Sequence, residues 1–259
     1  MSARYGQHFL SNRHAAERIA REAGADDKND VLEIGPGKGA LTGLLMTARR
    51  LVAVEVDERM AIGLRSRYGT SRPNFELVHQ DFLKFDLNSL TSKAPFKVVG
   101  NLPYNLTSPI LRKLSEWTNW STAVVMVQKE VGDRLSAKVG TPEYGALTVG
   151  MNVSCTIEHI FELSQKSFDP PPKVKSVVVR LRRRPEPLFN DVDRITRVIQ
   201  AAFQQRRKTI ENSFSHGLGF DKAMVREALA HLALDPMLRA ERLTVEDFIR
   251  VTRKLLPAC

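Results

Sequence analysis

The chain has 259 residues and a formal net charge of +10 at pH 7, and 42% of its residues are hydrophobic. This length accommodates one large domain or two modest ones with a real core. The sequence lacks the 18-residue apolar run of a membrane helix, and its amino terminus lacks the apolar segment of a secretion signal. The two cysteines, Cys155 and Cys259, have no partners at metal-ligand spacing. We therefore expect a cytoplasmic protein with neither a zinc site nor a disulfide framework.

Short apolar runs alternate with helical patterns through the first two thirds of the chain. Runs typical of strands lie at 31–34, 51–56, 75–78, 97–100, 122–127, 151–157 and 176–182. This alternation predicts an α/β domain with a Rossmann-like, doubly wound, mostly parallel sheet. The β-branched run at 176–181 is expected to pair as a hairpin with residues 150–155.

The first of these runs leads into a glycine-rich turn, Gly35-Pro36-Gly37-Lys38-Gly39, and then into the start of a helix. Glycines let a ligand approach the backbone closely, and the amino terminus of a helix adds hydrogen-bond donors. The spacing is one residue shorter than the G-x-G-x-x-G dinucleotide fingerprint. It favours a loop around a nucleoside with a small-molecule tail over a pyrophosphate cradle. The alternative is a turn that serves only tight packing.

The next two strands each end in a carboxylate. Glu55 lies twenty residues after Gly35, where an acidic side chain accepts hydrogen bonds from ribose hydroxyls. Asp57, two residues on, is better suited to capping the following helix. Asp81 closes the third strand and is suited to accept a hydrogen bond from an adenine amino group.

The fourth strand ends in Asn101-Leu102-Pro103-Tyr104. Open α/β sheets bind ligands at the carboxyl ends of their strands. Asn101 offers a side-chain carbonyl, Pro103 stiffens the loop and Tyr104 offers an aromatic face. Together they suit a planar base held by its exocyclic amino group. The alternatives are an ordinary strand-to-helix turn, in which Asn and Pro are common, and a Tyr104 that belongs to the core.

No strand is expected beyond Pro185, where Pro185-x-Pro187 is interpreted as a linker. Apolar residues at helical spacing predict a helix within 191–214. Asp221 can cap a helix that runs to Leu234, and Thr244 begins a capping box for a last helix that ends near Leu256. The predicted domains are therefore an α/β domain at 1–184 and a small all-α domain at 185–259.

Positive charge is concentrated around the predicted boundary. The segment 180–215 contains nine Arg or Lys and four Asp or Glu, a net of +5. This concentration favours a polyanionic partner, with a solvated charged face as the alternative. The tightest clusters have few aromatic neighbours, which favours phosphate contact over base stacking. The predicted RNA-binding residues are Arg182, Arg183, Arg206, Arg207 and Lys208.

In combination these motifs resemble class I S-adenosylmethionine-dependent methyltransferases. They resemble more closely the ribosomal RNA adenine dimethyltransferases that modify two adjacent adenines near the 3′ end of small-subunit rRNA. The resemblance covers about residue 4 to residue 254, and His8 stands where some members of the family carry Asn. The motifs that carry it are Tyr5-Gly6-Gln7-His8-Phe9-Leu10, Glu33 to Gly39, Asn101 to Tyr104, Gln128-Lys129-Glu130-Val131, Tyr144-Gly145, Phe168-Asp169-Pro170-Pro171-Pro172-Lys173-Val174 and Gln205-Arg206-Arg207-Lys208-Thr209.

The resemblance implies methyl transfer from S-adenosyl-L-methionine to N6 of two adjacent adenosines, giving N6,N6-dimethyladenosine, coupled to maturation of the small subunit. Cofactor binding is expected at His8, Leu10, Gly35, Glu55, Asp81 and Asn101. Catalysis is expected at Asn101, Leu102, Pro103 and Tyr104, with Phe168 covering the second face of the base.

Alternative roles remain for Phe168 and for Glu33, the first residue of the glycine motif. Glu33 is also suited to orienting the glycine turn, and Phe168 to stapling the rigid proline loop.

The target base must be flipped out or single-stranded to reach such a pocket. No metal is expected, because the sulfonium is itself the electrophile. The expected partner is the small ribosomal subunit or its rRNA, met by a monomer without membrane contact.

Three other functions compete with this interpretation. The first is adenine methylation of large-subunit rRNA, as in antibiotic-resistance enzymes. The second is a nucleic-acid-binding factor of ribosome assembly or transcription, against which the intact Gly35, Glu55, Asp81 and Asn101 argue. A nicotinamide dehydrogenase is disfavoured by the glycine spacing and by the Asn101 to Tyr104 motif.

Overall fold

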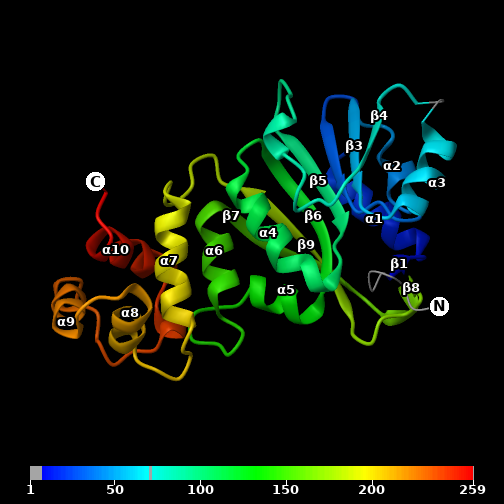
Figure 1. Ribbon diagram of the computed structural model, residues 1–259. Helices are drawn as coiled ribbons and strands as arrows, with labels where there is room; N and C mark the ends of the chain where they lie inside the picture. The colour runs from blue at the N-terminus through cyan, green and yellow to red at the C-terminus, as the bar shows by residue number, and fades with distance from the viewer. Residues whose placement is uncertain (1–7, 70–71, 259) are drawn as a thin grey trace. The chain divides into compact units, whose positions relative to one another are not determined.

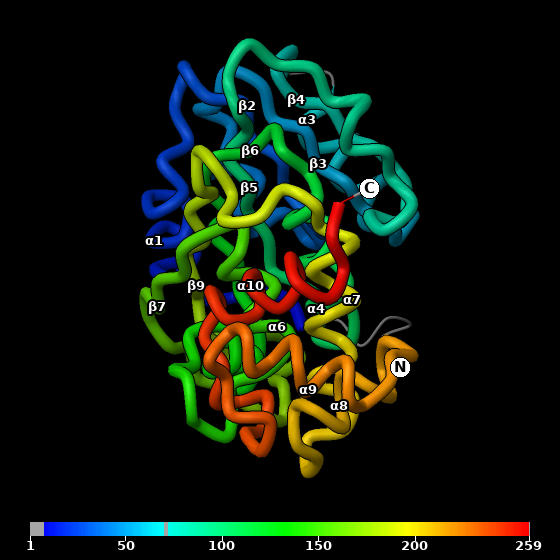
Figure 2. Tube along the Cα trace, turned by 90° about the vertical axis from the view of Figure 1, so that its left-hand side faces the viewer, coloured from blue at the N-terminus to red at the C-terminus, as the bar shows by residue number. Residues whose placement is uncertain are grey.

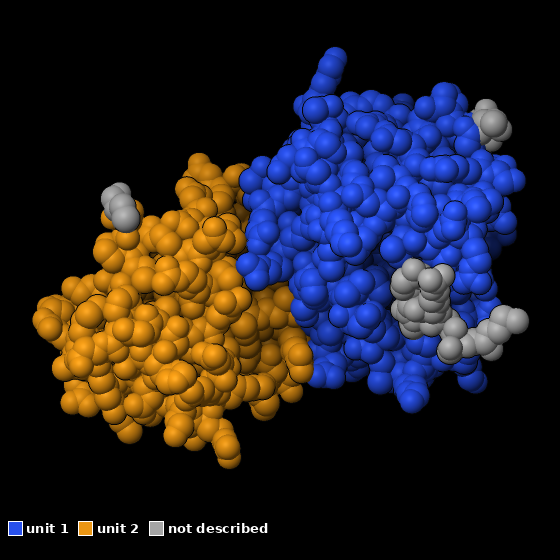
Figure 3. Space-filling model, viewed as in Figure 1, with its two compact units in different colours: residues 1–132, 157–183 blue, residues 133–156, 184–259 orange. Residues whose placement is uncertain are grey.

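The computed structural model describes residues 8–69 and 72–258 and divides the chain into two compact units (Figure 3). Unit 1 comprises Met1–Gly132 and Ile157–Arg183, and unit 2 comprises Asp133–Thr156 and Arg184–Cys259. The Tyr5-Gly6-Gln7 motif and Cys259 lie outside the described residues. The later change of unit falls one residue from the predicted boundary. Residues 133–156, however, group with unit 2 and not with the predicted first domain.

Unit 1 is built around the predicted sheet. Its strands are β1 (Phe9–Leu10), β2 (Asp30–Ile34), β3 (Arg50–Glu55), β4 (Phe75–His79), β5 (Phe96–Asn101), β6 (Trp120–Gln128), β7 (Cys155–Leu163), β8 (Phe168–Asp169) and β9 (Ser176–Arg183). The first two residues of β7 precede the second segment of unit 1. Its helical elements are α1 (Arg13–Ala23), α2 (Thr42–Leu45), α3 (Glu58–Tyr68), α4 (Thr107–Glu116), the start of α5 (Lys129–Leu135) and the short 3-10 turns η1 (Leu87–Ser89), η2 (Tyr104–Leu106) and η3 (Gln165–Ser167).

Within the described residues, seven strands form one sheet in the order β4-β3-β2-β5-β6-β9-β7. Figure 1 draws the strands as arrows, and Figure 2 traces the chain from a view turned by 90°. Strands β4, β3, β2, β5 and β6 pair in parallel, and β9 pairs antiparallel with β6. Leu32, Val52 and Val124 are fully buried because helices cover both faces of such a sheet, so the strands read as continuous apolar runs. The predicted α/β fold class is confirmed.

Helices pack on this sheet through narrow apolar stripes. Helix α1 begins at the N-cap Asn12, ends at Gly24 in the left-handed region, and buries Ile19 in a cluster with Val99 and Val124. A second, two-stranded sheet joins β1 to β8 in antiparallel register, with Leu10 opposite Phe168. No helix within the described ranges is long and apolar enough to cross a membrane.

The hairpin strand predicted at 150–155 is wrong, because Ala146–Ser154 form helix α6. Val149, Met151 and Val153 are buried there, and the periodicity of a short apolar run does not separate a strand from a buried helix. The Gly145 N–H donates to Thr148 Oγ1 at 3.2 Å, which fixes where the helix begins. The strand next to β9 on the side away from β6 is β7, which starts only at Cys155.

Unit 2 consists of helices that share one apolar core. They are the end of α5, α6 (Ala146–Ser154), α7 (Val192–Phe203), α8 (Ile210–Leu218), α9 (Lys222–His231), the 3-10 turn η4 (Ala240–Arg242) and α10 (Val245–Leu255). The predicted caps are present, with Asp221 at the start of α9 and a Thr244–Asp247 capping box at α10. The core joins Val149 of α6 to Ile199 of α7 and Phe248 of α10, which explains why residues 133–156 belong here.

Two sequence interpretations change in unit 2. The helix expected within 191–214 is two helices, separated by a turn at 204–208. The segment around Pro185 is not a free linker, because the N–H groups of Arg184 and Leu188 donate to the carbonyls of Ser154 and Val153, both at 2.9 Å.

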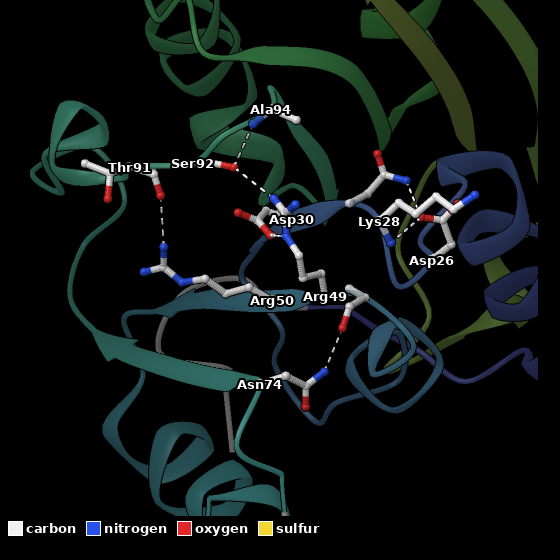
Figure 4. Close-up of polar contacts among 11 residues, drawn as sticks. Asp26, Lys28, Asp30, Arg49, Arg50, Asn74, Thr91, Ser92 and Ala94 are labelled. Atoms are coloured by element: carbon white, nitrogen blue, oxygen red, sulfur yellow. Dashed lines mark hydrogen bonds and ion pairs between the residues drawn. The ribbon is translucent and has the colours of Figure 1, made fainter.

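Polar side chains cluster around the amino ends of β2 and β3 in unit 1 (Figure 4). Arg49 donates from Nε to Asp30 at 2.7 Å and from Nη2 to Ser92 at 3.2 Å. Arg50 donates to the Thr91 carbonyl, and Asn74 donates to the Ala48 carbonyl at 2.7 Å. These groups satisfy one another and so close this edge of the sheet.

Candidate active site

Unit 1 contains a cavity of about 140 Å³ at the carboxyl ends of β2, β3 and β5. Ligands of open α/β sheets bind at this edge. The predicted site residues that line the cavity are His8, Leu10, Gly35, Glu55, Asn101, Leu102, Pro103 and Tyr104. Asp81 and Phe168 are not in its lining, although the neighbours of Asp81, Gln80 and Phe82, are.

The glycine-rich turn has the backbone geometry that its sequence predicts. Gly35, Gly37 and Gly39 have φ values of 64°, 56° and 83°, in the left-handed region that side chains disfavour. A Cβ on Gly37 would lie 2.9 Å from the Phe9 ring, so the amino-terminal segment packs directly on this turn. Any larger residue at position 37 would force the Phe9 ring to move.

Glu55 anchors the turn and faces the cavity. Its Oε2 accepts from the Gly37 N–H at 2.9 Å, and its Oε1 accepts from the Asp57 N–H at 2.8 Å. Burial raises the pKa of Glu55, and these backbone hydrogen bonds oppose the increase. Asp57 caps α3 as the sequence predicts, accepting from the Arg59 N–H at 3.0 Å.

Glu33 is the second carboxyl group in the cavity wall. It is 1% exposed, and its Oε2 has no hydrogen-bond partner among the described residues. Burial raises its pKa to about 8, and the negative charge of Glu55 adds to the shift. A buried acceptor without a partner at a cavity wall is a candidate contact for a ligand.

Asn101 is held in one orientation at the end of β5. Its Nδ2 donates to the backbone carbonyl of His8 at 2.8 Å, which leaves Oδ1 as the acceptor on the other side of the amide. His8 thus acts through its backbone, as expected from a position where some members of the family have Asn. The His8 ring donates from Nδ1 to the Pro170 carbonyl at 2.8 Å.

Tyr104 lies three residues further on, in η2. Its ring is partly buried, and its centroid lies 5.5 Å from that of the His8 ring, at an interplanar angle of 32°. Its hydroxyl lies 2.8 Å from Ser176 Oγ. Burial raises the pKa of the Tyr104 phenol and the hydrogen bond with Ser176 opposes that change, so the phenol remains neutral near pH 7.

Asp81 begins a single helical turn that follows β4. Its Oδ1 accepts from the Leu83 N–H at 2.9 Å, and its carbonyl accepts from the Phe85 N–H at 3.0 Å. Lys113 of α4 closes the other end of this turn, donating from Nζ to the carbonyls of Leu83 at 2.8 Å and Phe85 at 2.5 Å. The turn is therefore held by hydrogen bonds at both ends, and Phe82 within it lines the cavity.

Phe168 is placed differently from the prediction. It is 4% exposed and belongs to the core cluster that contains Leu10 and Val178. The β1–β8 register, with Leu10 opposite Phe168, draws the ring into that core. In this arrangement Phe168 does not face the cavity, and its role against a base stays a prediction.

The predicted RNA-binding arginines differ in how much the fold uses them. Arg183 donates to the Ser115 carbonyl at 3.3 Å and lies over the Trp120 ring, whereas Arg182 is exposed. The three basic residues at 206–208 are exposed in the turn between α7 and α8. The sequence had instead suggested that Arg206, Arg207 and Lys208 lie on a helix. Arg206 donates to the Pro142 carbonyl at 2.5 Å and so helps to hold the loop before α6.

Sequence reasoning missed three residues that shape this site. Ser176 contacts Tyr104 across 72 residues of sequence, and Lys113 contacts the Asp81 turn across about thirty. Phe9 covers Gly37 and receives the Lys38 ammonium at 4.8 Å from its ring centroid. The apolar pair Phe9-Leu10 beside the polar Gln7-His8 was the one signal available. The sequence contains no signal for a partner that lies far along the chain, such as Ser176.

The sheet order, the antiparallel β9 and the cavity at the carboxyl ends of the parallel strands define a class I methyltransferase. Residues 1–255 match the family model described as ribosomal RNA adenine dimethylase. The chain belongs to the ribosomal RNA adenine dimethylase family. Members of this family are S-adenosylmethionine-dependent methyltransferases that act on RNA.

Individual relatives agree with this assignment. The chain is 41% identical to ribosomal RNA small subunit methyltransferase A of Desulfitobacterium hafniense, over 97% of this chain and 91% of the relative. Identity to the protein of the same name from Coxiella burnetii is 35%, with 98% of each chain covered.

Two solved structures are also similar. A dimethyladenosine transferase from Plasmodium falciparum superposes with a TM-score of 0.81 at 26% identity, covering 94% of this chain and 96% of that one. The 23S rRNA methyltransferase ErmE superposes with a TM-score of 0.70 at 31% identity, covering 95% and 99%.

Proposed function

We propose that the protein transfers methyl groups to N6 of two adjacent adenosines near the 3′ end of small-subunit rRNA, in the cytoplasm and as a monomer. The observation that carries the proposal is the Asn101 amide. The His8 carbonyl fixes its orientation beside Tyr104, at the wall of a cavity with two buried carboxyl groups. The similarity over nearly the full length to small-subunit methyltransferases supports the choice of substrate.

The cavity fits S-adenosyl-L-methionine, a ligand with a cationic sulfonium, an ammonium and a ribose. Glu55 and Glu33 supply buried acceptors, and the open backbone of Gly35 allows close approach. Phe82 and Pro103 supply apolar surface for a base. Asp81 is proposed to contact the adenine amino group, which requires a small rotation of a side chain that now caps its own turn. The bound cofactor would supply a methyl group on sulfur, which leaves with the bonding electrons remaining on the sulfur.

The residues of the chain orient the nucleophile. Asn101 Oδ1 and the Leu102 carbonyl accept the two amino hydrogens of the target adenine, which directs the N6 lone pair toward the methyl carbon. The amino group releases its proton to solvent only after transfer, so a strong base is not needed. Tyr104 stacks on the ring of the target adenine, and Pro103 restricts the backbone conformations of the loop. This is catalysis by alignment and preorganised dipoles.

The decisive experiment uses small and large ribosomal subunits that lack the modification, each incubated with the protein and radiolabelled S-adenosylmethionine. We expect label only in the small subunit, as N6,N6-dimethyladenosine after nuclease digestion, at two adjacent positions. Label in the large subunit alone would replace the proposal with the specificity that the ErmE-like structure suggests. Binding of either subunit without any labelled nucleoside would favour an assembly factor.

The α7–α8 turn is proposed as part of the RNA-binding surface. Arg207 and Lys208 are exposed, whereas Arg206 also holds the Pro142 loop, so only the first two are clean probes. A double change of Arg207 and Lys208 to Gln should weaken subunit binding and flatten its salt dependence by ~0.7–0.9 log units of slope per lost phosphate contact. Arg239→Gln with Lys254→Gln removes the same charge elsewhere in unit 2. Equal salt slopes for the two double variants would identify the turn as a solvated face.

A further inference from the structure

The hydroxyl of Tyr104 meets that of Ser176, the first residue of β9, at 2.8 Å. Ser176 is fully buried and lies opposite Gln128 in the β6–β9 register, so its position is set by the sheet. Tyr104 lies in η2, a short turn between β5 and α4, and its ring is only partly buried. The contact therefore joins a side chain on a short turn to a buried residue of the sheet.

Packing alone does not fix the Tyr104 ring. An aromatic side chain turns about two torsions, and side-chain packing on one partly exposed face leaves both soft. The His8 ring lies against it at 5.5 Å, tilted by 32°, and constrains one side. The phenol oxygen is the side-chain atom farthest from the backbone. A hydrogen bond at this oxygen therefore restrains both side-chain torsions, χ1 and χ2, together. Stacking of aromatic groups needs a defined ring plane and separation.

Among the described residues, the Ser176 hydroxyl contacts only that of Tyr104. A buried hydroxyl without a partner costs about 1–3 kcal/mol, so a serine is retained at a fully buried sheet position only where its hydroxyl is used. The nearby residues of β9, Val177 and Val178, are both apolar. An alanine would fill the same place in the sheet without any polar atom to satisfy.

We propose that Ser176 is a positioning residue for methyl transfer: its hydroxyl holds the Tyr104 ring in the plane on which the target adenine stacks. The inference rests on the proposed function of Tyr104. It adds the start of β9 to the catalytic apparatus. The pair acts as one unit, so removing either hydroxyl frees the same ring.

The test compares Ser176→Ala, Tyr104→Phe and the double variant on unmodified small subunits. Tyr104→Phe keeps the aromatic face and removes only the hydroxyl. Each single variant should lower kcat roughly tenfold, the double variant should lose no more than either single one, and cofactor affinity by calorimetry should be unchanged. Non-additive losses of this kind identify groups that act together. Ser121→Ala, which removes a hydroxyl near the amino end of β6, is the matched control and should retain the parent kcat.

The activities of these variants distinguish a positioning role of Ser176 from a purely structural one. Full activity in Tyr104→Phe would overturn the inference even if Ser176→Ala failed to fold. Losses that multiply in the double variant would also overturn it, because they would show that the two hydroxyls act independently. A lower melting temperature with unchanged kcat would assign the contact to stability alone. If the parent protein methylated neither subunit, the proposed function would fail first, which is a different result from an active parent with insensitive variants.

Discussion

Strand β2 carries a buried carboxyl group near each edge of the sheet, and the two groups have opposite environments. Asp30 begins the strand and receives the Arg49 Nε at 2.7 Å (Figure 4). Burial alone would raise the pKa of Asp30, but hydrogen bonds from Arg49 and Ser92 outweigh it and lower the pKa. Glu33, near the end of the same strand, has a pKa raised to about 8, chiefly by burial.

This difference indicates that polar groups at the amino ends of the strands stabilise the fold, whereas those at the carboxyl ends are available to bind a ligand. At the amino edge Asp30, Arg49 and Arg50 already have protein partners, so a ligand has little to gain from them. At the carboxyl edge Glu33 Oε2 lacks a partner among the described residues and Asn101 Oδ1 is turned away from the His8 carbonyl. Acceptors without partners cost stability and are retained where a ligand satisfies them. Changes at the two edges should therefore affect different measurements.

The largest effect is expected at the carboxyl edge from Asn101→Ala. This change removes the acceptor that orients the adenine amino group, and turnover on small subunits should fall on the order of 10²–10³-fold. Cofactor affinity by calorimetry should stay within a few-fold, because Gly35 and Glu55 are unchanged in the cavity wall. Near-normal methyl transfer by this variant would remove Asn101 from the mechanism.

Glu33→Gln should stabilise the protein in a pH-dependent way. The folded-state pKa of about 8 exceeds the ordinary value of 4.5, so folding favours the protonated form. The contribution of Glu33 to stability is therefore complete below pH 4.5 and is lost as the pH rises through 8. Relative to the parent, the variant should gain on the order of 2–4 kcal/mol across this range in denaturant unfolding. A constant difference between pH 5 and pH 8 would show that Glu33 is ionised in the folded protein.

Glu55→Ala should weaken binding of S-adenosylmethionine by about 1–3 kcal/mol, because a buried carboxylate acceptor for ribose hydroxyls is lost. The glycine turn also loses the acceptor of the Gly37 N–H. Glu55→Gln keeps an acceptor oxygen and should recover part of the loss, which separates the two contributions. Calorimetric affinity equal to that of the parent in Glu55→Ala would contradict the ribose assignment.

The smallest effect is expected at the amino edge. Asp30→Asn weakens the contact with Arg49 and should lower the free energy of unfolding by about 1–2 kcal/mol at pH 7. The penalty should shrink as the pH falls through the lowered pKa of Asp30, since the parent then loses the same charge. Cofactor affinity and kcat should equal those of the parent. A loss of cofactor affinity in this variant would break the contrast between the two edges.

Much of the candidate site could be predicted from the residues at the carboxyl ends of the strands. Gly35, Glu55 and Asn101 were predicted to meet because parallel strands place their carboxyl ends at one edge, and all three line the cavity. Phe168 lacked such a constraint. Its neighbour in sequence is a proline-rich loop, and only the pairing with Leu10 of β1 shows that the ring enters the core.

The helix and strand predictions failed where local pattern is ambiguous. Residues 150–155 are apolar enough for either a strand or a buried helix, and the core of unit 2 selected the helix. The basic residues at 206–208 follow a strong helical pattern, yet α7 ends before them and Thr209 caps a new helix. In the first case the deciding contacts come from residues distant in sequence, and in the second a local cap begins the new helix.

By itself the sequence determined the α/β class, the glycine turn and the polar ends of the strands, because these depend on local spacing and on the alternation of strands and helices. The caps of α9 and α10 were equally local, since Asp221 and Thr244 bond to N–H groups two or three residues away. The tertiary structure alone decided that Ser176 meets Tyr104, that Lys113 closes the Asp81 turn and that Glu33 Oε2 has no hydrogen-bond partner among the described residues. These facts depend on which distant side chains burial brings together, and burial is a property of the packed chain and not of any segment.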